Sequence, residues 1–333
     1  MLKLTKNELN KMLLSKKPYL ILALLIIFIA LFAYGEKYSY DKGIERLEVI
    51  SEDLSFNWEN LAKQQIKDME RRLTSPYMSL EGKKAVAIEI EQLKYFLDNG
   101  INPITPSSAK FAVQFVEQGI VLLIPLLIII LAADLVSGEF SGRTIKVLMT
   151  RAVPRWQILL SKLLALLMMT TLVILLTAVL SVVISGLFFG RWGFDEPVIT
   201  GFVMSNGSLS SNQVVQVSQL AYMLLIYSLA WFVAVIIGCI SLMVSVLVKS
   251  TPAAIGIIMS ALIGGQFLQF FLADWEIVKY FFVSNLNLTK YLTGSYQFID
   301  GMSFNFSFGV LSLWGIGTLV ISFIIFSRKD ILV

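Results

Sequence analysis

The sequence predicts an all-α membrane protein with six transmembrane helices, cytoplasmic N and C termini, and an extracytoplasmic helical hairpin between the first two membrane helices. Three observations carry this prediction. First, 56% of the 333 residues are hydrophobic and the mean hydropathy is +0.76, whereas soluble domains are about 45–50% apolar. Second, the apolar residues cluster in six runs with few or no charges, and a helix needs about 20 such residues to cross a bilayer. Third, lysine and arginine are concentrated in alternate connections, which sets the orientation of the chain.

The order of the elements follows from these runs. Residues 1–17 are expected to form a cytoplasmic amphipathic interfacial helix, because leucines and a methionine alternate there with lysines. The expected spans are 18–35, 112–136, 159–189, 219–248, 253–272 and 307–327. The expected connections are an extracytoplasmic helical domain at 36–111, a cytoplasmic segment at 137–158, an extracytoplasmic loop at 190–218, a cytoplasmic turn at 249–252, extracytoplasmic re-entrant or interfacial helices at 273–306, and a cytoplasmic tail at 328–333.

Basic residues in the short connections assign the two sides of the membrane, since these residues favour the cytoplasm. One side receives Lys3, Lys6, Lys11, Lys16, Lys17, Arg143, Lys146, Arg151, Arg155, Lys162, Lys249, Arg328 and Lys329. The shorter connections on the other side offer only Arg191, Lys279 and Lys290. Both termini and the 137–158 segment are therefore predicted to be cytoplasmic.

The 36–111 region is predicted to be an antiparallel helical hairpin. Apolar residues between Leu47 and Leu73 recur with helical spacing, and a second helix is expected from Leu80 to Leu97. Gly100 follows as the natural left-handed cap of that second helix. A region of this size is marginal as an independent core, so we expect it to pack on the membrane domain or on another subunit. It is either a spacer, or a lid or substrate-sensing element.

The 137–158 segment is basic and partly polar although it joins two apolar runs. Thr144 to Thr150 places Ile145, Leu148 and Met149 on one surface with basic residues beside it, which predicts a short amphipathic helix. Its apolar residues are too few to anchor it in lipid, so they are available to a protein partner. The alternative is that the segment carries only the charge that orients the chain.

Several classes of function are excluded by composition. The chain has no histidine, so imidazole chemistry and histidine-ligated metal sites are impossible, and a single cysteine, Cys239, allows no intrachain disulfide. A net charge of +4 without a basic and aromatic patch does not suggest nucleic-acid binding. No phosphate-binding loop is present, because only three residues separate Gly138 from Gly142 and Arg143 stands where such a loop needs lysine. We predict no catalytic residue and no metal site.

One set of residues resembles a known family. It comprises Glu139, Gly142, Thr144, Leu148, Arg151, Arg155 and Lys162. This set is similar to the cytoplasmic signature of ABC-2 type transporter permeases, in which a Glu, a Gly-Thr pair, a Leu, a Pro and an Arg link the second and third spans. Two positions depart from the pattern: Arg143 separates Gly142 from Thr144, and Pro154 directly precedes Arg155. The topology resembles the family over the whole chain except the 36–111 region, which is similar to the subgroup with a large first extracellular loop.

The resemblance implies a function as the permease subunit of an ATP-driven exporter in a bacterial plasma membrane. The 137–158 segment would be the coupling helix that docks on a cytoplasmic ATPase. The residues expected to contact the ATPase are Glu139, Gly142, Arg143, Thr144, Leu148, Arg151, Pro154 and Arg155. Two ATPase subunits would bind ATP and Mg, and a second permease subunit, identical or homologous, and membrane lipid would complete the assembly. The chain itself would not be an enzyme, and its substrate would be a peptide antibiotic, a drug, a lipid or an ion.

Two acidic residues lie at the ends of the second span. Glu117, at the outer end, is a candidate for the substrate path, because ionisable residues inside a membrane are costly and often functional. Asp134, at the inner end, is expected to pair with a basic residue such as Lys162. The alternative function is a non-transporting sensor or scaffold whose hairpin binds a ligand or a partner. A membrane-embedded enzyme is disfavoured by the lack of histidine, of paired buried carboxylates and of a facing Ser/Lys pair.

Overall fold

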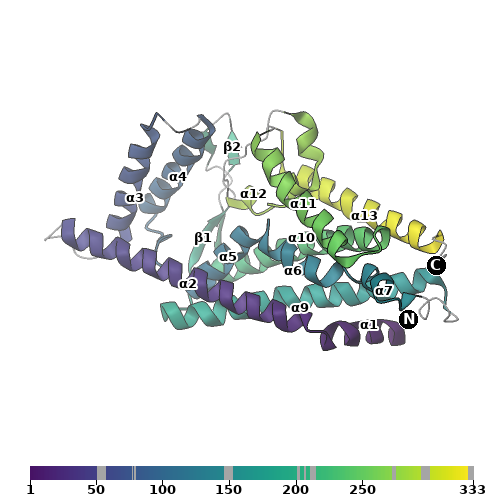
Figure 1. The fold of residues 1–333 in the computed structure, drawn as a ribbon. Coiled ribbons are helices and arrows are strands. Elements are labelled where there is room, and N and C mark those ends of the chain that lie inside the picture. The colour runs from purple at the N-terminus through teal and green to yellow at the C-terminus, as the bar shows by residue number, and fades with distance from the viewer. Residues whose placement is uncertain are drawn as a thin grey trace.

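The computed structural model is a bundle of long helices with small additions at one end (Figure 1). It describes residues 1–50, 58–76, 78, 80–145, 153–200, 203–205, 208–210, 215–271, 275–293 and 301–328. Five helices in this part are long and apolar enough to cross a bilayer, or six if the bent pair α5–α6 is one span. The predicted helical membrane protein is therefore confirmed at this level, and the chain is a multi-pass membrane protein.

The N-terminal third contains four helices. They are α1 (Leu2–Leu14), α2 (Lys17–Ile50), α3 (Trp58–Leu73) and α4 (Leu80–Asp98). Helix α2 does not end where the first expected span does, because a helix ends at a breaking signal and not at the surface of the lipid. Helices α3 and α4 pack side by side, with Leu61 and Ile88 buried and an ion pair between Lys94 Nζ and Glu70 Oε1 at 3.1 Å.

The expected continuous span at 112–136 is broken in the structure. Helices α5 (Ser108–Gly119) and α6 (Leu123–Ala132) meet at an angle of 66°. Pro125 lies in the first turn of α6 and cannot donate a hydrogen bond to the carbonyl of Val121, so the helix is interrupted before it. The sequence analysis predicted a span here but did not predict this bend.

The remaining long helices form the rest of the bundle. They are α9 (Arg155–Phe189), α10 (Gln219–Leu247), α11 (Thr251–Phe271) and α13 (Phe304–Arg328). Helix α10 is central: 72% of the residues in its most apolar window are buried, against 22–28% in α2, α9, α11 and α13. It packs against α13, α6, α9 and α5. The less buried helices present large apolar side chains outward, as lipid-facing helices do.

Residues 190–218 were expected to be a loop, but they contain four short strands. They are β1 (Pro197–Thr200), β2 (Val203–Ser205), β3 (Ser208–Ser210) and β4 (Val215–Ser218). Strand β1 pairs antiparallel with β4, and β2 pairs antiparallel with β3, in two separate sheets. The β-branched residues of β1 and β4 favour extended backbone, a signal that is short enough to be missed in sequence.

Two further regions complete the chain. The 275–293 segment forms the 3-10 helices η1 (Glu276–Tyr280) and η2 (Phe282–Asn285) and the short helix α12 (Lys290–Thr293). The indole N–H of Trp314, in α13, donates to the carbonyl of Tyr280 at 3.0 Å and holds η1 on the bundle. Helix α7 (Ser137–Ser141) follows α6 at the opposite end.

The bundle has two distinct ends, and long-range contacts identify both (Figure 1). At one end, here called the α7 end, α1, α7, the start of α9 and the end of α13 lie together. At the other, here called the strand end, the start of α5 meets the end of α9, where the N–H groups of Ser108 and Ala109 donate to the carbonyls of Arg191 and Trp192 at 2.9 and 3.0 Å. The bent pair α5–α6 therefore runs from the strand end to the α7 end.

Candidate functional site

The start of α7 is fixed to the central helix through a serine hydroxyl. Ser245 Oγ, in α10, accepts hydrogen bonds from the N–H groups of Val136 and Ser137, each at 3.0 Å. The hydroxyl of Ser137 donates to the carbonyl of Ala133 at 2.6 Å and lies 3.2 Å from Thr251 Oγ1 at the start of α11. These contacts satisfy N–H groups that a helix start leaves without partners, and they tie α7 to both α10 and α11.

The end of α7 closes in a tight turn that contains Arg143, one of the two departures from the family signature. The N–H of Thr144 donates to the carbonyl of Glu139 at 3.0 Å, and the N–H of Arg143 donates to the carbonyl of Phe140 at 3.1 Å. This is a Schellman pattern, which needs one residue in the left-handed region. Arg143 occupies that position with φ 57°. A Cβ added at Gly142 would lie 3.0 Å from the carbonyl oxygen of Gly138, so glycine suits the turn before it.

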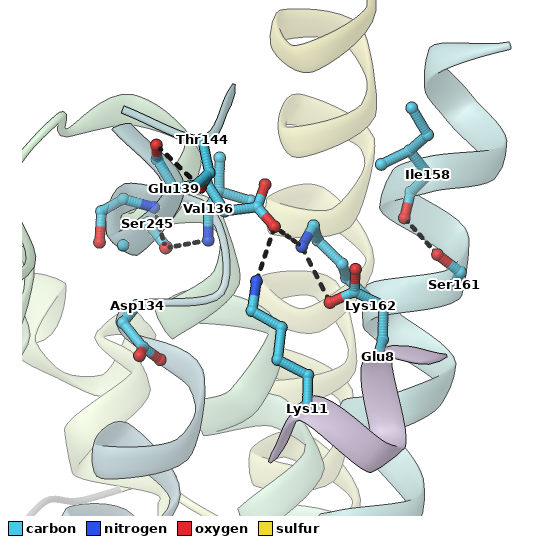
Figure 2. A network of polar contacts seen from close by, with 12 residues as sticks. Glu8, Lys11, Asp134, Val136, Glu139, Thr144, Ile158, Ser161, Lys162 and Ser245 are labelled. Atoms are coloured by element: carbon cyan, nitrogen blue, oxygen red, sulfur yellow. Dashed lines mark hydrogen bonds and ion pairs between the residues drawn. The ribbon is translucent and has the colours of Figure 1, made fainter. Parts of the chain in front are cut away.

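Four charged side chains from three helices meet beneath α7 (Figure 2). Glu139 Oε1 lies 2.7 Å from Lys162 Nζ of α9 and 3.0 Å from Lys11 Nζ of α1. Lys162 Nζ also lies 3.0 Å from Glu8 Oε2 of α1. The side chain of Lys162 is fully buried, and that of Glu139 is only 5% exposed. We call Glu8, Lys11, Glu139 and Lys162 the ion cluster.

The ion cluster has no net formal charge, and its ion pairs attach α7 to two other helices. Two carboxylates and two ammonium groups balance each other, which lets charges be buried at this site. Burial lowers the pKa of Lys11, but Glu139, Glu8 and Asp134 outweigh it and raise that pKa above its ordinary value. Glu139 Oε2 is buried and has no hydrogen-bond partner among the described residues. The cluster thus connects α7 to both α1 and α9.

The sequence suggested that Asp134 pairs with Lys162, but the structure shows a different partner. Its carboxylate forms an ion pair with Lys17 at the start of α2, while Lys162 is occupied by the two glutamates of the ion cluster. The reason is the position of Asp134, which lies just after α6, beside the junction of α1 and α2. A cavity of about 90 Å³ lies here, lined by Glu8, Lys11, Met12, Ser15, Lys17, Leu131, Asp134 and Leu135.

The far part of the 137–158 segment returns to the bundle at α9. Pro154 is the residue before the first turn of α9, and Arg155 Nη1 donates to the carbonyl of Ser327, near the end of α13, at 3.2 Å. Gly142, Arg143 and Thr144 are exposed. Leu148 and Arg151, also expected to contact an ATPase, lie outside the described residues, as does most of the amphipathic helix expected at 144–150.

Glu117 is remote from this site, near the end of α5 before the bend. Its Oε1 accepts a hydrogen bond from the hydroxyl of Tyr222, in α10, at 3.1 Å. The side chain is half-buried, and its hydrogen bond joins α5 to α10 just before the bend. Within the described residues, no group of three or more acidic or cysteine side chains is placed to hold a metal ion.

Sequence reasoning missed the contribution of α1 to the site. Glu8 is the only acidic residue of the basic leader, and Lys162 is a lone charge inside an apolar run. A lone charge in such a run requires a partner, so the sequence did indicate a buried pair at Lys162. It did not indicate that Glu8 is the partner, because Glu8 and Lys162 are 154 residues apart.

Fold and site together define a helical multi-pass membrane protein whose first helix, α1, is joined to α7 and α9 by ion pairs to the buried side chains of Glu139 and Lys162. The chain belongs to the family described as "Protein of unknown function (DUF2705)", whose sequence profile matches residues 84–332, about three quarters of the chain.

Two curated relatives come from Bacillus subtilis (strain 168). The first, "Uncharacterized protein YhcI", is 30% identical over 206 residues, which are 61% of this chain and 63% of that protein. The second, "Uncharacterized membrane protein YdbK", is 26% identical over 214 residues, which are 63% of this chain and 78% of that protein. The match to the first therefore spans less than two thirds of its length. The name of the second agrees with the membrane class.

Proposed function

We propose that this chain is the transmembrane permease subunit of an ATP-driven ABC-2 type exporter. Six spans, with α5–α6 counted as one, would place the α7 end in the cytoplasm and α3, α4 and the strand end outside. The 137–158 segment would dock on one of two ATPase subunits, which would supply ATP and Mg binding. A second permease subunit would complete the substrate path.

The observation that carries this proposal is the ion cluster. A coupling segment has to pass a displacement of its partner on to the membrane helices, so it must be rigidly joined to them. Glu139 joins the segment to α9 through a buried ion pair with Lys162 and to α1 through an ion pair with Lys11, whose side chain is exposed. Arg155 joins the other end of the segment to α13. Breaking a buried ion pair on one side typically costs about 3–5 kcal/mol, so these helices would move with the segment.

The exposed residues of the segment support a contact with a partner. Gly142, Arg143 and Thr144 form a turn on the surface, while Glu139 faces inward. Glu139 would therefore attach the segment to the membrane helices, and the contact with the ATPase would be made by other residues of the segment. The basic residues of the α7 end support its cytoplasmic orientation through the positive-inside rule.

The experiment is purification of the intact chain from native membranes, with measurement of ATP hydrolysis in the purified material. The test variant is Arg143→Ala/Leu148→Ala, which removes exposed or expected contact side chains and leaves the ion cluster intact. Interface hot spots cost about 2 kcal/mol or more, roughly thirtyfold in affinity, so we expect the hydrolysis to be lost. The matched control is Lys63→Ala/Lys67→Ala on α3, whose side chains are also exposed and which we expect to behave as the native chain.

Two results would contradict the proposal. Full ATP hydrolysis with Arg143→Ala/Leu148→Ala would mean that the segment is only a charged loop. No ATPase with the native chain, under conditions where the complex of another exporter survives, would favour the sensor or scaffold instead.

A further inference from the structure

Helix α1 has two faces with different surroundings. The docked face carries Thr5 and Met12, which are buried, and the two ion-cluster residues Glu8 and Lys11. These positions are spaced so that Thr5, Glu8 and Met12 fall on one side of the helix. That side rests on α9.

The opposite face is apolar and basic at once. Leu2 is 87% exposed and Leu14 is 85% exposed, and Leu13 is also exposed. Lys3 and Lys6 of α1 and Lys16 of the turn after it are exposed and form no ion pair with any residue that the structure describes. A helix with exposed leucines beside unpaired lysines has the composition of an element that lies on an acidic membrane surface.

The position of α1 identifies the membrane as the occupant of this face. Helix α2 begins at Lys17, and its first apolar residues, Tyr19 and Leu20, are exposed on the lipid-facing side. The outward face of α1 is thus joined within a few residues to a surface that must contact lipid. Each lysine near an acidic bilayer contributes about 1 kcal/mol, or roughly fivefold in binding.

The docking of α1 on the bundle buries little apolar surface and depends on the ion cluster. Met12 is its only fully apolar buried side chain, and the interface contains the cavity of about 90 Å³ lined by charged residues. Cavities with several polar groups hold water. A helix of 13 residues is marginal on its own in water, so an external surface decides how firmly α1 is held.

We propose that α1 binds acidic lipid headgroups through Lys3, Lys6, Lys16 and its exposed leucines, and that this contact holds Glu8 and Lys11 in the ion cluster. Acidic lipid then stabilises the attachment of α7 to α1 and α9 through the ion cluster, and removing acidic lipid weakens this attachment. The effect on coupling rests on the proposed function; the lipid contact and its transmission to α7 do not.

The test is hydrogen exchange of the full chain in nanodiscs, without any ATPase. One set of nanodiscs contains phosphatidylcholine alone, and the other also contains phosphatidylglycerol. We expect backbone amides of α1 and of residues 138–144 to exchange about tenfold more slowly with phosphatidylglycerol, a conservative value for three lysines. The difference should shrink in concentrated salt, which screens exposed charges.

Two sets of variants separate the lipid contact from its transmission. Lys3→Gln/Lys6→Gln/Lys16→Gln should abolish the lipid dependence in both segments, whereas the control Lys63→Gln/Lys67→Gln/Arg72→Gln, with the same loss of charge on α3, should keep it. Lys11→Gln, which removes one of the two links from α1 to Glu139, should keep the lipid dependence of α1 and reduce that of residues 138–144.

Three outcomes would overturn the inference. They are equal exchange in the two bilayers, an unchanged lipid dependence in the triple variant of α1, and slower exchange on addition of a protein partner but not of acidic lipid. Because no ATPase is present, failure of the proposed exporter function would leave the lipid result intact, and failure here would leave that function standing.

Discussion

At the scale of single residues, Lys162 shows how strongly the site depends on charge balance. Its ammonium group is fully buried between Glu139 and Glu8. Lys162→Met removes the buried partner of both Glu139 and Glu8 and leaves Glu139 only the exposed Lys11. Removing one partner of a buried ion pair costs about 3–5 kcal/mol. We therefore expect this variant to lower the free energy of unfolding by roughly 3 kcal/mol, measured by denaturant titration in mixed micelles.

The companion variant Lys162→Met/Glu139→Leu tests the cause. Removing both buried charges avoids the unpaired group, and Glu8 and Lys11 are closer to solvent, so the double variant should be more stable than Lys162→Met alone. The exposed pair Lys94–Glu70 is the control, and Lys94→Met should cost less than about 1 kcal/mol. A double variant less stable than Lys162→Met alone would contradict this explanation.

Arg143 separates stability from binding at a single position. A left-handed backbone costs a non-glycine residue about 1–2 kcal/mol, and Arg143 has φ 57°. Arg143→Gly should therefore raise the free energy of unfolding by up to about 1 kcal/mol. If the proposed coupling role is right, the same variant should lose ATP hydrolysis in the purified complex. A variant that is less stable than the native chain would show that the Arg143 side chain matters to the fold.

At the scale of elements, the strand end is held by a close approach between the residues after α9 and the start of α5. Gly193 has φ 69°, and a Cβ there would overlap Ser107 Oγ and Cβ. Gly190 has φ 67° with open space around it. Both alanine variants carry the backbone cost, but only Gly193→Ala adds overpacking, which costs about 1–3 kcal/mol. We expect Gly193→Ala to unfold at a clearly lower temperature than Gly190→Ala in detergent; equal melting temperatures would mean that Ser107 moves aside freely.

The elements that could be predicted from the sequence are those with a local signal. Long apolar runs predicted the spanning helices, and Gly100 was predicted as a left-handed cap and has φ 65°. The bend between α5 and α6 was missed because hydropathy averaged over a window is insensitive to Pro125. The strands of the 190–218 region were missed because each has only three or four residues.

The site was predictable only in part, for a different reason. The segment itself stood out by its charge between two apolar runs. Its partners did not, since the contacts of Glu139 with Lys11 and of Lys162 with Glu8 join residues 128 and 154 positions apart. One sequence contains no information on which distant charges meet. Asp134 was therefore assigned to Lys162 and is found with Lys17.

At the scale of the whole molecule, the bent pair α5–α6 decides how many times the chain crosses the membrane. Taken as a re-entrant loop, the pair would leave five spans and place the termini on opposite sides. Taken as one span, it gives six and places them on the same side. The contacts favour one span: α5 starts beside Arg191 at the strand end, and α6 ends beside Lys17 at the α7 end. A segment anchored at both ends of the bundle has to cross it.

Cysteine labelling tests this count in intact cells with a membrane-impermeant maleimide. In a Cys239→Ala background, single cysteines replace Asn7 in α1, Ser141 in α7, Lys67 in α3 and Arg328 in α13, all of which are exposed. Six spans with the proposed orientation predict labelling at Lys67 in intact cells and labelling at the other three positions only after permeabilisation. The permeabilised sample also shows that each cysteine is reachable. If Asn7 and Arg328 respond differently, the chain has an odd number of spans and α5–α6 does not cross; if Ser141 is labelled together with Lys67, α7 lies outside and cannot meet a cytoplasmic ATPase.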